Sequence, residues 1–360
     1  MSTFEEKVEK EIRTNAFFIK VITVAIVLIC LGTIAYAEDA HRLTMSGRKL
    51  TAEEVESIEQ QLEQNPHDTQ LRTKLLGYYS GNQFRNPSAR KARQRHILWL
   101  IVNSPETDVL GIPDGTLNAH LDRDAYIQGK ESWLDHIKQK PDDLKVLAHS
   151  ANFFRMYDRE LAIISLQKGQ ALDKNNPKWY RDLGHIYSLG ILRKSSEDKV
   201  IAAEKALEQF EIAYKLSTKS GQDALLQNLA KMALAANKTQ KAKEYAEQML
   251  NQNRAGWNYG NNIHHGNLIL GRIALRSDDL EEAKKRLIKA GETPGSPQLN
   301  SFGPNMTLAL ELLKKGEKEV VLKYFELCLK FWKRGKDRIQ KWSTDIENDE
   351  LPNFRANLRY

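Results

Sequence analysis

The sequence has only two cysteines, Cys30 and Cys328, and their surroundings argue against a disulfide or a zinc site. Cys30 lies in an apolar run, and Cys328 lies in a pattern typical of a helix. The sequence contains no C-x-x-C pair and no Cys/His spacing of a zinc ligand set. We therefore expect neither an intrachain disulfide nor a structural metal.

Glycine and proline are also scarce, with 20 and 10 residues and no tract of either. Their scatter excludes a collagen-like or linker-rich chain. Hydrophobic residues make up 41% and charged residues 28%, which is too apolar for a disordered chain. The net charge of +7 suits an acidic protein, an anionic membrane surface or nucleic acid about equally, so charge alone selects no partner.

Catalytic motifs are absent as well. The chain has no Gly-rich phosphate loop, no G-x-S-x-G elbow, no H-E-x-x-H and no paired-carboxylate motif. The densest acidic group, at 278–282, falls at the predicted start of a helix, where it complements the helix dipole. We expect a protein that is not an enzyme and that uses no cofactor.

The N-terminus contains the one long apolar run, residues 16–37. Ala35-Tyr36-Ala37 is an A-x-A site of the kind that signal peptidase cuts, but the head before the run is long and mixed in charge. A cleaved signal peptide and an uncleaved membrane anchor of about 20 residues both remain open. Either one places the rest of the chain in the cell envelope, outside the cytoplasm, as a secreted or membrane-anchored body.

Beyond Leu50 the chain has helix-like patterns throughout and an internal repeat. The clearest unit pairs Y-x-x-L-G-x-x-Y at 180–187 with A-x-x-x-F-x-x-A at 206–213. Three further units carry a Leu-small pair followed twelve positions later by a small or apolar residue. These are Leu229-Ala230 with Ala242, Leu270-Gly271 with Ala283, and Leu308-Ala309 with Val321. Small residues at this spacing let paired helices approach closely, and stacking buries the face that one hairpin cannot bury alone.

This pattern resembles the tetratricopeptide repeat over roughly residues 71–332. The resemblance implies an all-α superhelix of helical hairpins, a solenoid that binds other proteins. We expect N-terminal helices with a degenerate first repeat at 38–115, the array at 116–332, and a capping helix with a tail at 333–360. Within that last segment Ile339, Trp342 and Ile346 fall on one helical face. The runs at 293–306 and 351–360 also look like those of a group of bacterial repeat proteins whose activity is not established.

Two insertions, at 257–267 and 294–305, fall at the same type of junction one repeat apart, so we expect them to be neighbours. Their aromatic and amide side chains suit contact with a peptide or a carbohydrate, although they could instead pack on each other. The predicted loop surface consists of Trp257, Tyr259, Asn261, Asn262, Asn300 and Phe302.

The first insertion also contains adjacent histidines, His264 and His265, which the repeat frame places at the start of a helix. Neighbouring side chains point about 100° apart on a helix, so the pair cannot chelate one ion in the usual way. We expect Asn262 to cap this helix and one histidine to pack against Trp257, with no metal bound.

The first helix of each repeat is expected to line a concave face. The positions that would face this groove are Lys145, His149, Arg181, His185, Gln227, Lys231, His265 and Arg272. Four of these side chains are basic and none is acidic, which predicts a groove for an acidic segment or a C-terminal carboxylate of another protein. A solvated face rich in good helix formers is the alternative.

A second basic cluster lies at 85–95. An extracytoplasmic location argues against nucleic acid, and a solvated helix start or contact with anionic lipid is favoured. The sequence as a whole predicts an envelope-located interaction scaffold, membrane-bound through its N-terminus if uncleaved. The alternative function is a small-ligand or carbohydrate-binding protein that uses the junctions at 257–267 and 294–305.

Overall fold

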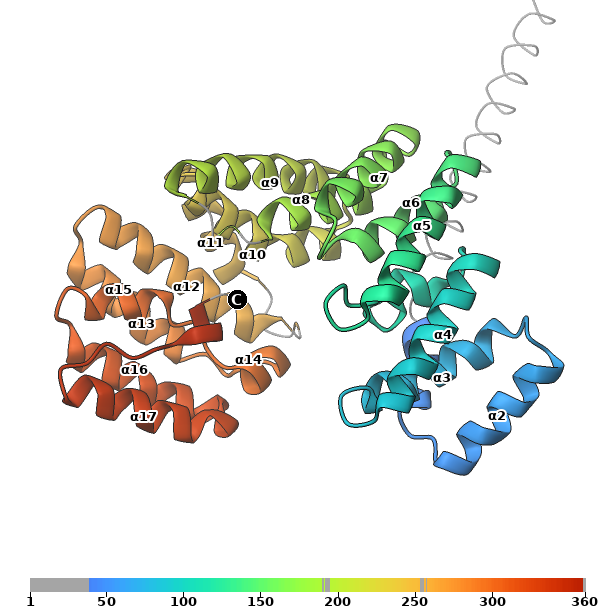
Figure 1. Ribbon diagram of the computed structural model, residues 1–360. Helices are drawn as coiled ribbons and strands as arrows, with labels where there is room; N and C mark the ends of the chain where they lie inside the picture. The colour runs from blue at the N-terminus through green and yellow to red at the C-terminus, as the bar shows by residue number, and fades with distance from the viewer. Residues whose placement is uncertain (1–38, 190, 192–194, 253–255, 257, 359–360) are drawn as a thin grey trace, which may run out of the picture. The chain divides into compact units, whose positions relative to one another are not determined.

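The computed structural model describes residues 39–189, 191, 195–252, 256 and 258–358, and these residues form helices and connecting turns with no strand (Figure 1). The expected all-α class is confirmed. The chain divides into two compact units, Met1–Leu172 and Asp173–Tyr360. The boundary falls inside the segment 116–332 that the repeat frame treats as one array. The predicted signal or anchor segment, 1–37, lies outside the described residues.

The described part of the first unit begins with a helical segment at 39–47. The elements that follow are α2 (Ala52–Gln64), α3 (Thr69–Asn82), α4 (Pro87–Asn103), η1 (Asp108–Gly111), η2 (Pro113–Gly115), α5 (Arg123–Gln139), α6 (Leu144–Phe154) and α7 (Arg159–Leu172). Thr51 and Glu54 form a capping box at the start of α2, in which each side chain accepts from the other's backbone N–H. This box satisfies two backbone donors that the first turn of a helix leaves free.

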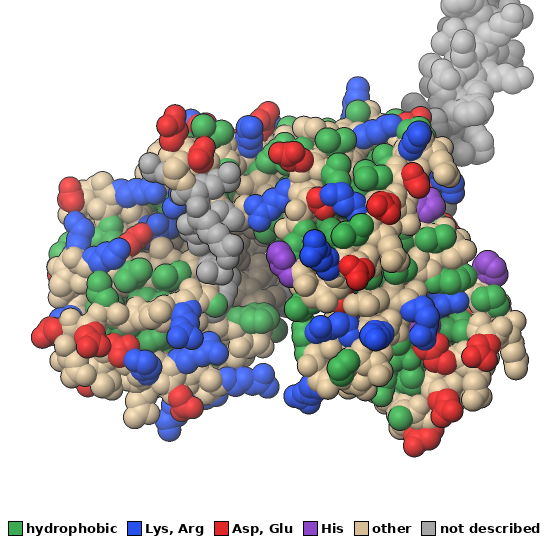
Figure 2. Space-filling model, viewed as in Figure 1, with side chains coloured by type: hydrophobic (Ala, Val, Ile, Leu, Met, Phe, Trp, Pro, Cys, Tyr) green, Lys and Arg blue, Asp and Glu red, His purple; other side chains and the backbone are tan. Residues whose placement is uncertain are grey.

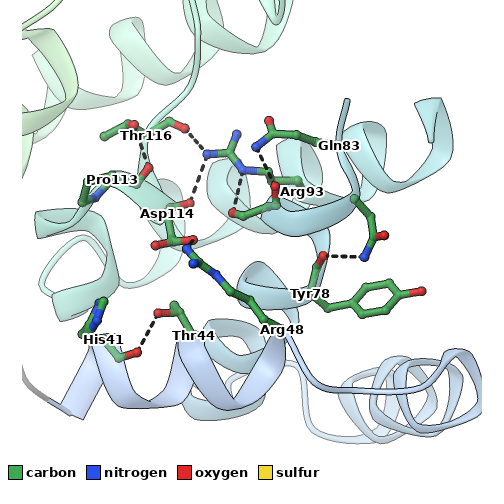
Figure 3. A network of polar contacts seen from close by, with 11 residues as sticks. His41, Thr44, Arg48, Tyr78, Gln83, Arg93, Pro113, Asp114 and Thr116 are labelled. Carbon is green, nitrogen blue, oxygen red and sulfur yellow. Dashed lines mark hydrogen bonds and ion pairs between the residues drawn. The ribbon is translucent and has the colours of Figure 1, made fainter. Parts of the chain in front are cut away.

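One arginine of the basic cluster at 85–95 is a buried structural residue. Only 5% of Arg93 is exposed, and its guanidinium donates to the carbonyl oxygens of Asp114 and Thr116 and to the Ser80 hydroxyl (Figure 3). On the other side of this turn, Arg48 forms an ion pair with the Asp114 carboxylate at 3.2 Å. The expectation of a solvated cluster is therefore wrong at Arg93, because α4 uses this side chain to hold the turn-rich segment 108–116.

The second unit runs through α8 (Pro177–Ser188), α9 (Ser196–Leu216), α10 (Lys219–Ala235), α11 (Thr239–Leu250), α12 (Tyr259–Arg276), α13 (Leu280–Gly291), α14 (Pro297–Phe302), α15 (Thr307–Leu313), α16 (Lys318–Phe331), η4 (Lys333–Gly335), α17 (Lys336–Glu347) and η5 (Arg355–Leu358). Helices α8 to α13 pack against one another in chain order, and α10 also reaches α12. The small residues that the repeat spacing singles out, Ala230, Ala242 and Ala283, are fully buried. Each therefore lies where one helix presses against the next.

The last helix covers the end of this stack, as expected. Ile339, Trp342 and Ile346 of α17 are all buried in one apolar core with Phe325 and Phe354. The ring centroid of Trp342 lies 5.0 Å from that of Phe354 and 6.0 Å from that of Phe325. Cys328 is buried in the same core as a free thiol, and burial holds its pKa above the ordinary value.

Candidate functional site

Helix α12 begins at Tyr259, five residues before the histidine pair. Asn258 is its N-cap residue, and Asn262 therefore lies in the first turns of the helix. The predicted cap at Asn262 and the helix start at His264 are both wrong. The expected contact of a histidine with Trp257 lies outside the described residues. The longer helix places four polar residues of the first insertion, Asn261, Asn262, His264 and His265, on buried positions of α12.

The two inserted junctions are in direct contact. The Thr293 hydroxyl donates to the carbonyl of Gly260 at 2.7 Å, and the Ser296 hydroxyl donates to Asn261 Oδ1 at 2.6 Å. Asn261 Nδ2 in turn donates to Gln298 Oε1 at 3.1 Å. The start of α12 is thus tied to α14 and to the turn before it, which makes one continuous wall from two segments.

Glycine is required at this seam. A Cβ atom built on Gly260 would lie 1.7 Å from the carbonyl oxygen of Gly295, which is a backbone atom that cannot rotate away. Gly295 itself has φ of +86°, in the left-handed region that glycine adopts without strain. Two glycines therefore let the backbones of the two junctions touch.

His264 is a structural residue. Its ring is fully buried, Nδ1 lies 3.0 Å from the carbonyl oxygen of Ala290, and the backbone N–H of Asn305 donates to Nε2 at 3.0 Å. Because Nε2 accepts, the proton resides on Nδ1 and the ring is neutral. Burial lowers the pKa of His264 to about 4. This histidine joins α13 to the segment after α14 and is not available to a ligand.

Neutral, buried His264 makes the stability of the second unit sensitive to acid. The unfolded chain takes up this proton near pH 6.5 and the folded chain only near pH 4, so the contribution is complete above pH 6.5 and is lost as the pH falls toward 4. We expect the loss to be about 3 kcal/mol. Urea unfolding at pH 7.0 and 4.5 should show a smaller pH dependence in His264→Phe than in wild type, whereas His185→Phe, at an exposed position, should keep the wild-type dependence. Equal pH dependence in all three proteins would contradict this role.

His265 faces a different environment. A cavity of about 980 Å³ lies against α10, the first turns of α12, and α14. Tyr259, Asn262 and His265 line it at every third position of α12, and Gln227 lines it from α10. Phe302, 63% exposed, lines it from α14. Six of the described lining residues carry a side-chain amide, so the cavity is rich in groups that both donate and accept hydrogen bonds.

Two buried polar side chains of this lining lack protein partners. Only 6% of His265 is exposed, and neither of its ring nitrogens has a hydrogen-bond partner among the described residues. Only 4% of Asn262 is exposed; its oxygen accepts a long bond of 3.4 Å from Asn258, and its nitrogen has no partner in the described part of the chain. Their unpartnered atoms are open to the cavity, because the fully enclosed side-chain atoms without a partner among the described residues are Trp133 Nε1, His136 Nδ1 and Trp179 Nε1. Asn262 and His265 therefore offer hydrogen-bonding groups to a ligand or to water in the cavity.

Lys231 stands one turn beyond Gln227 on α10. It forms no ion pair or hydrogen bond with any residue that the structure describes, and burial alone lowers its pKa to about 8. Its charge acts on the cavity histidine, because burial first and Lys231 next hold the pKa of His265 well below the ordinary value. Lys219, at the rim, differs from Lys231, because it pairs with Asp223 at 2.9 Å.

The other cations of the predicted groove have acidic neighbours. Lys145 pairs with Asp108 at 3.1 Å in the first unit, and in the second unit Arg181 lies 3.3 Å from Asp182 and Arg272 lies 2.7 Å from Glu311. These acids come from positions outside the groove frame, which is why the pattern of basic residues did not reveal them. Figure 2 shows acidic and basic side chains interspersed on the visible face of the second unit.

The two remaining groove histidines also contact protein groups. His149, in the first unit, is buried, and its Nδ1 lies 2.8 Å from the carbonyl oxygen of Pro105. His185, in the second unit, is exposed and packs edge-on against the ring of Phe210. Gln227 and His265 are thus the groove residues that line this cavity, and Lys231 lies one turn beyond Gln227 on α10.

The residues of the predicted loop surface also differ in whether they line the cavity. Tyr259, Asn261, Asn262 and Phe302 line the cavity, whereas exposed Asn300 does not. The Asn300 amide, oriented to satisfy its neighbours, donates to the carbonyls of Ser296 and Phe331. Sequence reasoning missed Gln298, which completes the amide wall. The Ser-Pro at 296–297 was its signal, because Ser followed by Pro is typical of a helix start and Ser296 caps α14.

No group of three or more His, Cys, Asp or Glu side chains in the described ranges is placed to hold a metal ion. No helix within those ranges is long and apolar enough to cross a membrane. No family model matches the chain, and no curated protein matches it either.

Proposed function

We propose that the chain is a tetratricopeptide-like binding protein whose ligand site is the cavity of the second unit, and that the ligand is an extended segment of another protein. The observation that carries the proposal is a pair of largely buried side chains, Asn262 and His265, whose unpartnered polar atoms are open to that cavity. A hydrogen bond from either group to a ligand would contribute about 0.5–1.5 kcal/mol net. A peptide backbone, with alternating donors and acceptors, supplies the partners that these groups and the surrounding amides lack.

The cavity supports this proposal better than the long basic groove does. Lys145, Arg181 and Arg272 already have acidic neighbours, so an acidic partner would have to compete for each of them. The volume of about 980 Å³ lies at the upper end of the usual range for ligand sites and suits a few residues of extended chain. As in the sequence-based expectation, the protein acts in the cell envelope, where its N-terminal segment delivers or anchors it.

A carbohydrate is the second candidate, and one observation favours it. Phe302 presents a largely exposed aromatic ring at the rim, beside Tyr259 and the amides of Asn258 and Gln298. Aromatic rings with neighbouring amides suit the apolar face and the hydroxyl groups of a sugar. Binding of neutral oligosaccharides, with no binding of peptides, would select this alternative.

The test compares cavity and groove variants of the full chain on an array of random dodecapeptides. His265→Phe and Asn262→Leu remove the unpartnered donors without removing bulk, and each should weaken peptide binding about tenfold. Arg181→Glu reverses a groove charge far along the helix stack from α12 and should leave binding unchanged. Loss in Arg181→Glu with no change in His265→Phe would transfer the site to the groove and overturn the proposal.

A further inference from the structure

Lys231 is the unusual charge of the second unit. It is the one cation near the cavity lining for which the described residues provide no acid, whereas Lys219 and Arg272 each have one. The Lys231 side chain is partly exposed, and partial burial lowers its pKa. A partly hydrated ammonium group gains more from a counter-charge than a fully exposed one does. An anion of a ligand can therefore bind Lys231 without displacing an acidic side chain of the described residues.

The neighbours of Lys231 limit the chemistry of that anion. Gln227, one turn earlier on α10, offers amide donors, and neutral His265 offers one ring N–H, while Lys231 supplies one positive charge. A group with one negative charge and two acceptor oxygens matches this set. A phosphate dianion would leave a negative charge unbalanced, because Lys219, which does line the cavity, is already paired with Asp223.

Asp223 itself defines the orientation of the ligand. It lies on the same stripe of α10 as Gln227 and Lys231, and eight residues of helix separate it from Lys231 by about 12 Å. It also accepts from Gln252 Nε2 at 2.9 Å. The cavity is thus lined by an acid at its Lys219 rim and bounded by an unmatched cation near Gln227 and His265, so an acidic group is favoured only at the second end.

We propose that the end of the cavity at Gln227 and His265, beside Lys231, receives a carboxylate of the bound ligand. This inference rests on the proposed function, because it assigns the chemistry of the ligand to the same cavity. The carboxylate is a peptide C-terminus, an Asp or Glu side chain, or a sugar acid, and the experiment separates these sources.

The experiment measures binding of fluorescent octapeptide pools to the full chain by polarisation. One pool has free C-termini and no Asp or Glu, a second is amidated and contains Asp and Glu, and a third is amidated and contains neither. Glucuronate and glucose are tested as competitors and, by calorimetry, as ligands in their own right. Each probe is tested on wild type, Lys231→Met, Lys231→Arg and the rim control Lys219→Met.

The expected result is binding of one carboxylate-containing pool at least about tenfold tighter than the carboxylate-free pool, as befits a charge-assisted contact. Lys231→Met should abolish this preference, while Lys231→Arg and Lys219→Met should retain it. Equal binding of all three pools would leave the peptide-binding function standing and overturn the carboxylate assignment. Binding of glucuronate over glucose, with no pool bound, would keep the carboxylate and overturn the peptide. Failure of every probe would overturn both.

Discussion

Replacement of Gly260 with alanine is expected to cost the second unit about 3 kcal/mol and to abolish ligand binding. The new methyl group would overlap the carbonyl oxygen of Gly295, so the start of α12 and the turn before α14 must separate. That separation also breaks the bonds from Thr293 to Gly260 and from Ser296 to Asn261. Hydrogen exchange of the full chain should show faster exchange over α12 and α14 and no change over α2 to α6.

The matched control is Gly266→Ala in the same helix. Its Cβ would meet the Ala246 carbonyl and the Leu250 side chain at 3.1 Å, a contact that small shifts relieve. The gain in helix propensity of about 1 kcal/mol offsets much of that cost. If Gly260→Ala exchanged no faster than Gly266→Ala, the close approach of the two junctions would not be what holds the cavity wall.

The second large effect has the opposite sign. Lys231→Met should raise the unfolding free energy of the second unit at pH 7 by about 2 kcal/mol, because it removes an unpaired, partly buried charge but keeps an apolar chain of similar length. The pKa of Lys231 is about 8 in the folded chain and 10.5 when exposed. Below pH 8 both states carry the proton and the cost is complete. As the pH rises from 8 to 10.5 the folded lysine is neutral, and the advantage of the variant should disappear.

Urea unfolding of wild type and variant at pH 7.0 and 10.0 measures this difference. Lys219→Met serves as control, since Lys219 is exposed and paired with Asp223 and should give no stabilisation at either pH. A destabilised Lys231→Met would mean that the ammonium has a favourable partner and that no ligand anion is needed there. Binding sites commonly retain groups that lower the stability of the fold, and a destabilising charge beside a cavity fits that pattern.

The sequence predicted the architecture well wherever packing alone decides it. The twelve-residue spacing placed Ala230, Ala242 and Ala283 at buried helix contacts, and the face of Ile339, Trp342 and Ile346 identified the capping helix. These features depend on helical periodicity, which is local. The contact between the junctions at 257–267 and 294–305 also follows from the repeat frame, because equivalent junctions of successive repeats are adjacent.

The sequence could not give the start of α12 or the separate roles of the two histidines. Residues 258, 261 and 262 are all asparagine, and each is a good N-cap, so local preference does not choose between them. The start of the helix is determined by Gly260, whose backbone packs against that of Gly295, a residue distant in the sequence. With the helix packed in this way, His264 contacts the Ala290 carbonyl and His265 lines the cavity.

The ion pairs of the predicted groove could not be predicted from the sequence for a related reason. Glu311 and Asp108 reach Arg272 and Lys145 across 39 and 37 residues, from elements whose register the basic positions do not fix. A pattern of like charges on one helix face therefore says little about its field until the opposing elements are placed. Lys231 differs from the other cations of the predicted groove because no described acidic side chain pairs with it. No pattern in the sequence predicts that difference.

The most direct measurement of the central claim is photocrosslinking in intact cells, with a photoreactive phenylalanine analogue in place of Phe302, at the exposed rim of the cavity. The same analogue at Ile164, exposed on α7 of the first unit, is the control. The proposed function predicts a protein adduct at position 302 that disappears when His265→Phe is added and that has no counterpart at position 164. An adduct at 302 that persists unchanged in His265→Phe, or capture at 164 alone, would contradict the assignment of this cavity as the binding site.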